Sequence, residues 1–257
     1  MATAATDTKK KRPRVFLDID IGDPDEHARQ AAAHARFLAF WREDGVKIYG
    51  APPPPAELDA ALRETLLEAY ASSAPRAATE AGDARAEPPD SLRAGRLVCE
   101  LYADEAPKAV QNFLALVRGS ATSKAQKKPL CYKGVRFHRV VRGFVAQAGV
   151  MNERLGTGES SFPGNAPFQD DKAALKLKHD GVGVLSMANA GKPHTNTSQF
   201  FFTLSEKGAP ALDGRHVVFG RVVEGAGVLA RIDAEAGAAD GEPPRAVVAI
   251  ADCGEVS

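Results

Sequence analysis

The chain has 257 residues, of which 44% are hydrophobic and 26% charged, and its formal net charge is zero. This length fits one large domain or two small ones, and the balanced charge excludes a global attraction to nucleic acid or anionic lipid. The three cysteines lie far apart and lack CxxC spacing, which argues against a disulfide framework or a zinc site. A reducing compartment is therefore expected.

Residues 1–14 are predicted to be a flexible basic tail. They contain no apolar stretch of the length that a signal peptide needs, and nowhere do 18 apolar residues run together, so no membrane span is expected. The run KKKRPR, residues 9–14, has two readings, a nuclear address or a solvated tail. The expected location is the cytoplasm, with the nucleus as the alternative.

Residues 15–22 alternate apolar and polar side chains, which predicts a half-buried strand. The chain then changes character, because Asp23 and Pro24 form a helix-start signal before an alanine-rich helix that ends in FLAFW. After the break APPPP, leucines spaced four apart predict a second helix, and a polar linker follows. Residues 23–94 are therefore expected to be a helical insertion and linker between two strands of a hairpin.

From residue 95 onward the pattern changes again. Leu97, Cys99 and Leu101 alternate as a strand, and Asp104 and Glu105 before Pro107 indicate the start of a helix. Most later apolar runs are short, rich in valine and phenylalanine, and separated by glycine, which is typical of a β-barrel or sandwich. A last helix is predicted at GAGVLARIDA, residues 225–234.

Four polar residues interrupt these apolar runs and indicate a binding site: Arg139, Gln147, Asn189 and His216. The serines nearby lack the G-x-S-x-G elbow of hydrolases, and the metalloprotease motif H-E-x-x-H is absent. The residue types therefore favour binding without a nucleophile or a metal, and no cofactor is expected.

Three segments of the chain resemble signature sequences of the cyclophilins: FHRVVRGFVAQAG, GVLSMANAGKPHTNTSQFF and LDGRHVVFGRVVEG. The resemblance covers residues 15–22 and about 95–257. It implies a mainly β fold, an eight-stranded antiparallel closed β-barrel capped by two helices, to which the helical insertion is added.

The resemblance also implies a function, peptidyl-prolyl cis/trans isomerisation, which is rotation about X–Pro bonds in peptides and proteins and assists protein folding. Arg139 would be the catalytic residue. The residues expected to bind substrate are His138, Phe144, Val145, Gln147, Ala188, Asn189, Phe201, Leu212 and His216. The alternative is a cyclophilin-like interaction or scaffold module of a larger assembly, in which isomerase activity is weak or incidental.

Two departures from the cyclophilin pattern bear on ligands. Ala211 stands where many members carry tryptophan, so weak or no cyclosporin binding is expected. Val145 replaces a common methionine, a mild change in an apolar wall. The insertion adds a further expectation, a protein partner that binds through residues 23–94. Neither a membrane nor nucleic acid is expected as a partner.

Arginine suits the implied chemistry. Amide resonance sets a barrier of about 20 kcal/mol to rotation of an X–Pro bond, and twisting the amide restores a lone pair to the proline nitrogen. A permanently charged, planar guanidinium can donate a hydrogen bond to that lone pair. Taken singly, Arg139 also fits a surface arginine with an ion-pair partner.

Overall fold

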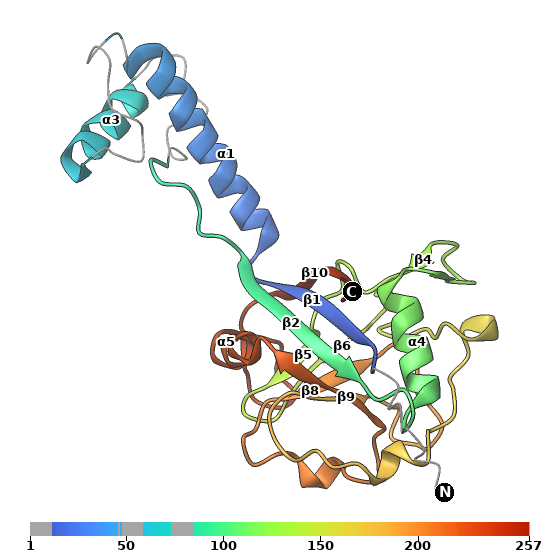
Figure 1. Ribbon diagram of the computed structural model, residues 1–257. Helices are drawn as coiled ribbons and strands as arrows, with labels where there is room; N and C mark the ends of the chain where they lie inside the picture. Colours follow the sequence, from blue (N-terminus) through green and yellow to red (C-terminus); the bar gives the residue numbers. More distant parts are fainter. Residues whose placement is uncertain (1–11, 46, 48–58, 73–84, 257) are drawn as a thin grey trace, which may run out of the picture. The chain divides into compact units, whose positions relative to one another are not determined.

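The computed structural model describes residues 12–45, 47, 59–72 and 85–256 (Figure 1). Contacts within the chain define two compact units, Met1–Ile21 with Arg93–Ser257, and Gly22–Leu92. The start of the basic tail, the APPPP break and most of the polar linker lie outside the described residues. Among the helices that the structure describes, none has the length and hydropathy to cross a membrane.

The first unit is built on an eight-stranded antiparallel sheet with the strand order β10-β1-β2-β9-β7-β8-β6-β5 (Figure 1). Its strands are β1 Arg14–Ile21, β2 Arg93–Leu101, β5 Arg139–Val141, β6 Val145–Ala148, β7 Val184–Met187, β8 Phe200–Thr203, β9 Val218–Glu224 and β10 Val248–Glu255. Two further strands, β3 Ala121–Thr122 and β4 Pro129–Leu130, form a separate short hairpin.

The edge strands β5 and β10 are not joined by a ladder within the described residues, so the sheet is an open half-barrel. The segment before β5 approaches β10 instead, where the N–H groups of Gly134 and Phe137 donate to the carbonyls of Ile250 at 2.7 Å and Val248 at 2.9 Å. The predicted strand number and antiparallel pairing are confirmed, whereas the predicted closure is wrong. Gly134 has a φ of 83° in a turn, and this turn keeps the segment from forming a continuous strand.

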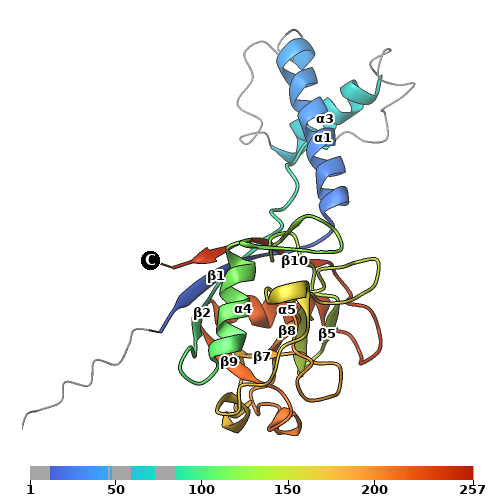
Figure 2. The ribbon, with the colours of Figure 1, turned by 90° about the vertical axis from the view of Figure 1, so that its right-hand side faces the viewer.

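Two helices flank the curved sheet, α4 Pro107–Val117 and α5 Ala226–Ala236. They lie on opposite sides of the strands, and α4 is nearer the viewer than α5 in Figure 2. The first turn of α4 is capped from a distance, because the N–H groups of Lys108 and Ala109 donate to the Asp171 carboxylate at 3.1 and 3.0 Å. Two helices are present as expected, but a residue remote in sequence supplies the cap of α4.

Strands β1 and β2 form the interrupted hairpin, and their pairing continues to Asp20 and Arg93 at the base of the insertion. The apolar side chains of β1 are buried, as their alternation predicts. Asp18 on the other face is also buried, at 8% exposed, because Arg96 binds its two carboxylate oxygens at 2.7 and 2.9 Å. These hydrogen bonds lower the pKa of Asp18 against the opposing effect of burial.

The second unit contains α1 Pro24–Phe40, a π-helical turn Trp41–Gly45 and α3 Ala60–Ser72. Asp23 caps α1 as predicted and accepts from the N–H of Asp25 at 2.8 Å. The aromatic end of α1 and the leucine face of α3 pack on each other in a cluster of Phe37, Trp41 and Leu66. This unit therefore has a small hydrophobic core of its own.

Two arginines of the basic run contact the folded domain. Arg12 pairs with Glu105 at 2.7 Å and Glu100 at 3.4 Å, and it lies over the Tyr102 ring at 4.4 Å. Arg14 pairs with Glu100 at 3.6 Å. These two side chains have a structural role here, and the nuclear address remains a prediction.

Candidate active site

A row of four side chains crosses the strands β5, β6, β8 and β7. In the register of the paired strands, Arg139 lies opposite Gln147, Gln147 opposite Phe201, and Phe201 opposite Ser186. Directly paired residues of antiparallel strands point to the same face, so all four lie on one side of the sheet. Their neighbours along the strands, including Phe200 and Phe202, point into the hydrophobic core. In this register the segment FHRVVRGFVAQAG has one face in the core and places Arg139 and Gln147 on the other.

Beside this row lies an apolar cluster that is separate from the main core. Val145, Ala188 and Phe201 are 2%, 8% and 3% exposed, and Phe144 and Leu212 pack against them. The His216 ring meets the Phe201 ring edge-on, with centroids 5.3 Å apart. Six of the residues predicted to bind substrate therefore come together in one patch: Phe144, Val145, Ala188, Phe201, Leu212 and His216.

Arg139 is held at the edge of the site by an ion pair. Its Nε and Nη2 donate to Asp240 Oδ1 at 3.1 and 2.7 Å. The Arg139 side chain is 32% exposed and that of Asp240 is 68% exposed. An ion pair this exposed contributes at most about 1 kcal/mol, so it orients the guanidinium without sequestering it. The Nη1 N–H groups remain for a ligand, because both bonds to Asp240 use the other two nitrogens.

Two amide side chains next to the row are already positioned. Gln147 Nε2 donates to Gln199 Oε1 at 2.9 Å. The Asn189 side chain donates to the Arg215 carbonyl at 2.9 Å and accepts from the Gly191 N–H at 3.1 Å. In the described part of the chain, nothing hydrogen-bonds to the backbone N–H or carbonyl of Asn189. Its backbone is therefore available to an extended peptide.

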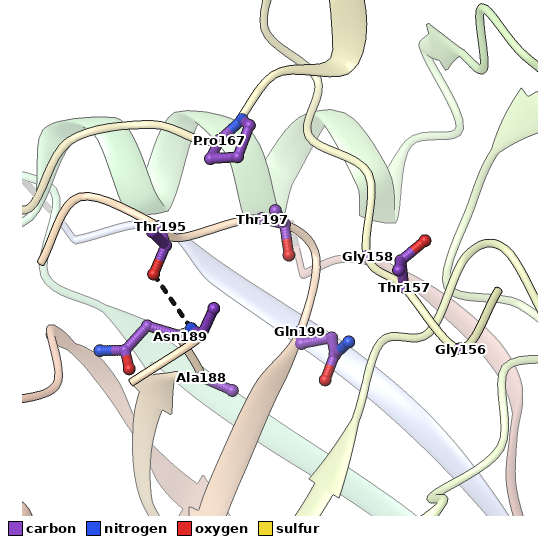
Figure 3. Close-up of a pocket in the computed structure, with 10 residues that line it drawn as sticks. Gly156, Thr157, Gly158, Pro167, Ala188, Asn189, Thr195, Thr197 and Gln199 are labelled. Atoms are coloured by element: carbon purple, nitrogen blue, oxygen red, sulfur yellow. Dashed lines mark hydrogen bonds between the residues drawn. The ribbon is translucent and has the colours of Figure 1, made fainter. Parts of the chain in front are cut away.

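A cavity of about 330 Å³ adjoins the apolar cluster and shares Ala188 with it (Figure 3). Its lining consists of Gly156, Thr157, Gly158, Pro167, Ala188, Asn189, Ala190, Thr195, Thr197 and Gln199. The Thr195 hydroxyl holds the loop by accepting from the Ala190 N–H at 3.0 Å. The residues that line it are all uncharged, so the cavity suits an uncharged side chain next to the apolar cluster.

His138 lies apart from the cluster. It lines a second cavity of about 410 Å³ together with Arg136, Val150, Glu153 and Gly156. The two cavities share Gly156, so His138 lines a cavity next to the first one. Ala211 is exposed on the turn Pro210–Leu212, next to Leu212, and leaves this rim of the patch small.

One group at this site was not predicted from the sequence, a hydrogen-bonded chain of Asp213, His179 and Ser186. His179 Nδ1 lies 3.0 Å from Asp213 Oδ1, and its Nε2 lies 3.0 Å from Ser186 Oγ. The order is that of a hydrolytic triad, but Ser186 is 0% exposed and a substrate cannot reach its hydroxyl. The arrangement is therefore structural.

Burial governs the titration of the histidines here. It lowers the pKa of His138, His179 and His216, and the bond from His216 Nδ1 to the Met187 carbonyl only partly opposes the shift. Burial also raises the pKa of Asp213, but hydrogen bonds from the backbone and ring of His179 and from Lys178 outweigh it and lower the pKa to about 2. The apolar patch thus faces neutral imidazoles at pH 7.

Acidification is expected to reduce the free energy of unfolding. Because the folded state holds these histidines neutral, the unfolded chain binds more protons once the pH falls below the ordinary histidine pKa of about 6.5. Stability should therefore fall from about pH 6.5 downward, and the low pKa of Asp213 extends the same trend below about pH 4. Urea unfolding at several pH values measures the slope, and His179→Asn should flatten it. A free energy of unfolding that rises on acidification would contradict the assignment.

Comparison with known proteins adds a second line of evidence. A model of the family described as cyclophilin type peptidyl-prolyl cis-trans isomerase/CLD matches residues 90–255. The chain belongs to the cyclophilin family. Every residue predicted for the site lies inside the matched range. Strand β1 of this cyclophilin chain lies outside it, although it pairs with β2 and β10.

A curated relative from Rhizopus delemar is named peptidyl-prolyl cis-trans isomerase cyp11. It is 46% identical to this cyclophilin over 168 residues, which cover 65% of this chain and 48% of the relative. The chain thus spans about half of the length of the curated relative it matches.

Proposed function

We propose that the chain is a peptidyl-prolyl cis/trans isomerase that catalyses rotation about X–Pro bonds in peptides and proteins and assists protein folding. The observation that carries the proposal is the row of Arg139, Gln147 and Phe201 beside an apolar patch. Family membership and the name of the Rhizopus delemar relative support the same activity.

The chemistry requires tighter binding of the twisted amide than of either planar form. The apolar patch holds the proline ring, while the backbone of Asn189 and the amide of Gln147 hold the flanking peptide. Arg139 then donates to the proline nitrogen as it becomes pyramidal, and its fixed positive charge favours the twisted amide. The adjoining cavity takes the side chain of a residue beside the proline, and its threonines favour small or polar groups.

A protease-coupled assay on the purified protein tests the proposal. The protein is expected to accelerate the cis-to-trans conversion of a tetrapeptide with a single X–Pro bond, in proportion to its concentration. Exchange spectroscopy by NMR on the same peptide provides a measurement without the protease. A folded protein that leaves both rates at the uncatalysed value would contradict the function.

The helical unit is expected to be dispensable for the isomerase domain. Its hydrophobic cluster and the main core share no residue, and β1 and β2 already pair at Asp20 and Arg93. Replacing residues 23–91 by a short glycine-containing turn should therefore change the free energy of unfolding of the domain by less than about 1 kcal/mol. Turnover on a tetrapeptide should also be preserved. Chemical unfolding and the isomerase assay measure both.

The same deletion protein tests the expectation that a partner protein binds residues 23–94. A protein that binds the full chain but not the deletion protein would support that role. A matched control is the full chain with Leu66→Asp, because Leu66 is buried in the cluster of the helical unit and a charge there unfolds this unit alone. Failure of the deletion protein to fold would show that the insertion belongs to the structural core.

A further inference from the structure

A buried imidazole contacts the apolar patch from behind. The His179 ring stacks on the Phe201 ring, with centroids 5.8 Å apart and an interplanar angle of 19°. The ring also bonds to Asp213, which directly follows Leu212 in the chain. One side chain therefore contacts two walls of the patch, Phe201 by stacking and the Leu212 turn through a carboxylate.

The hydrogen bonds determine which nitrogen carries the proton. A carboxylate only accepts, so His179 Nδ1 donates to Asp213. Nε2 of the neutral ring lies 3.0 Å from Ser186 Oγ, whose single hydrogen is shared between Nε2 and the Val217 carbonyl at 3.1 Å. Asp213 Oδ1 also accepts from the backbone N–H of His179 at 3.0 Å. Residue 179 therefore holds the carboxylate at two points, while Ser186 on β7 fixes the plane of the ring.

The carboxylate in turn anchors the pocket wall. The turn Pro210–Leu212 ends at Asp213, whose N–H donates to the Pro210 carbonyl at 3.1 Å. The turn has no core side chain of its own, because all three of its residues are at least partly exposed. Asp213 also pairs with Lys178 at 3.2 Å, and the Ala209 N–H donates to the His179 carbonyl at 2.7 Å. The His179 ring is the member of this set of contacts that also touches Phe201, so it links the Leu212 turn to that ring.

We propose that His179 is a positioning residue for the proline pocket, and that it sets the separation between Leu212 and Phe201. The inference rests on the isomerase function proposed above and concerns substrate binding. His179 is 1% exposed, so it acts through its two neighbours and does not touch a substrate. A pocket wall contacts the proline ring in planar and twisted amides alike. Loss of the constraint therefore raises KM with little change in kcat.

Three substitutions at position 179 separate the two polar contacts. His179→Leu removes both and is expected to raise KM for an X–Pro tetrapeptide about tenfold, with kcat changed less than about threefold. His179→Asn places an amide N–H where Nδ1 lies and should restore most of the affinity, because the bond to Asp213 returns. His179→Gln places its amide where Nε2 lies, near Ser186, and should restore little.

Leu116→Ala is the matched control for lost stability. Leu116 is fully buried in α4 and belongs to the main core, so its truncation should lower the melting temperature and leave KM unchanged. Peptide titration by NMR gives Kd for the same proteins and measures the pocket independently of turnover.

Unchanged KM and Kd in His179→Leu, equal rescue by asparagine and glutamine, or a parallel loss of kcat would overturn the positioning role. In each of these outcomes an active parent protein leaves the isomerase function intact. A parent protein that binds the peptide without turning it over would contradict the proposed function, and the Kd series would then decide the role of His179.

Discussion

Arg139→Ala is expected to remove most of the isomerase activity, lowering kcat about a hundredfold to a thousandfold, or about 3–4 kcal/mol of transition-state stabilisation. The guanidinium is the one cation in the row of Arg139, Gln147, Phe201 and Ser186 across the sheet, and it alone there can favour the pyramidal proline nitrogen. Its bond to the exposed Asp240 carboxylate is weak enough for substrate to compete. Turnover of an X–Pro tetrapeptide measures the loss, and the melting temperature should stay near that of the parent.

Arg142→Ala is the matched control, because Arg142 is a nearby exposed arginine that bonds to the Ala234 carbonyl away from the row. It should retain full activity. Arg139→Lys keeps the charge but loses the planar fork, and it should recover only part of the turnover. Parent-like activity in a folded Arg139→Ala protein would refute the mechanism.

Ala211→Trp is expected to tighten cyclosporin binding by about 2–4 kcal/mol, which is about thirtyfold to a thousandfold in Kd. Ala211 is exposed on the short turn that also carries Leu212, at the rim of the apolar patch. An indole there would add a large apolar surface and an N–H donor, both of which the parent rim lacks. Titration calorimetry compares the two proteins.

Ala211→Leu separates the two contributions of the indole, since leucine adds apolar surface without a donor. It should give an intermediate affinity. Nanomolar binding of cyclosporin by the unmodified protein would show that the rim needs no tryptophan, and the expected effect of Ala211 would then be wrong.

Local patterns in the sequence predicted the local elements well. The cap of α1 at Asp23 and the alternation along β1 depend on neighbours in the chain, and both agree with the structure. The cap of α4 by Asp171 could not be predicted, because the residue that supplies it is remote in sequence. The incomplete closure of the barrel has a similar cause, since it depends on how the turn at Gly134 meets β10.

At the site, too, the sequence predicted some residues and missed those whose role depends on residues remote in the chain. Three residues of the row, Arg139, Gln147 and Phe201, were predicted through the resemblance to cyclophilin motifs, and the strand register explains why they share a face. Ser186 was not predicted. His179 was missed because KHDGVG has no periodicity or motif around it, and its role arises from Asp213 and Ser186 on other elements. Asp240, which holds Arg139, likewise comes from a distant loop. Sequence patterns identify what touches a ligand more readily than what holds those groups in place.

The pairing of β1 has a consequence for synthesis on the ribosome. Val15 of β1 lies opposite Cys99 of β2 and Glu255 of β10, so β1 needs a partner strand that is synthesised much later. The helical unit Gly22–Leu92, in contrast, is a compact unit of contiguous sequence, and it can fold while the rest of the chain is still being translated. Until β10 emerges, β1 has an unpaired edge, and the nascent domain depends on that edge being shielded from other chains.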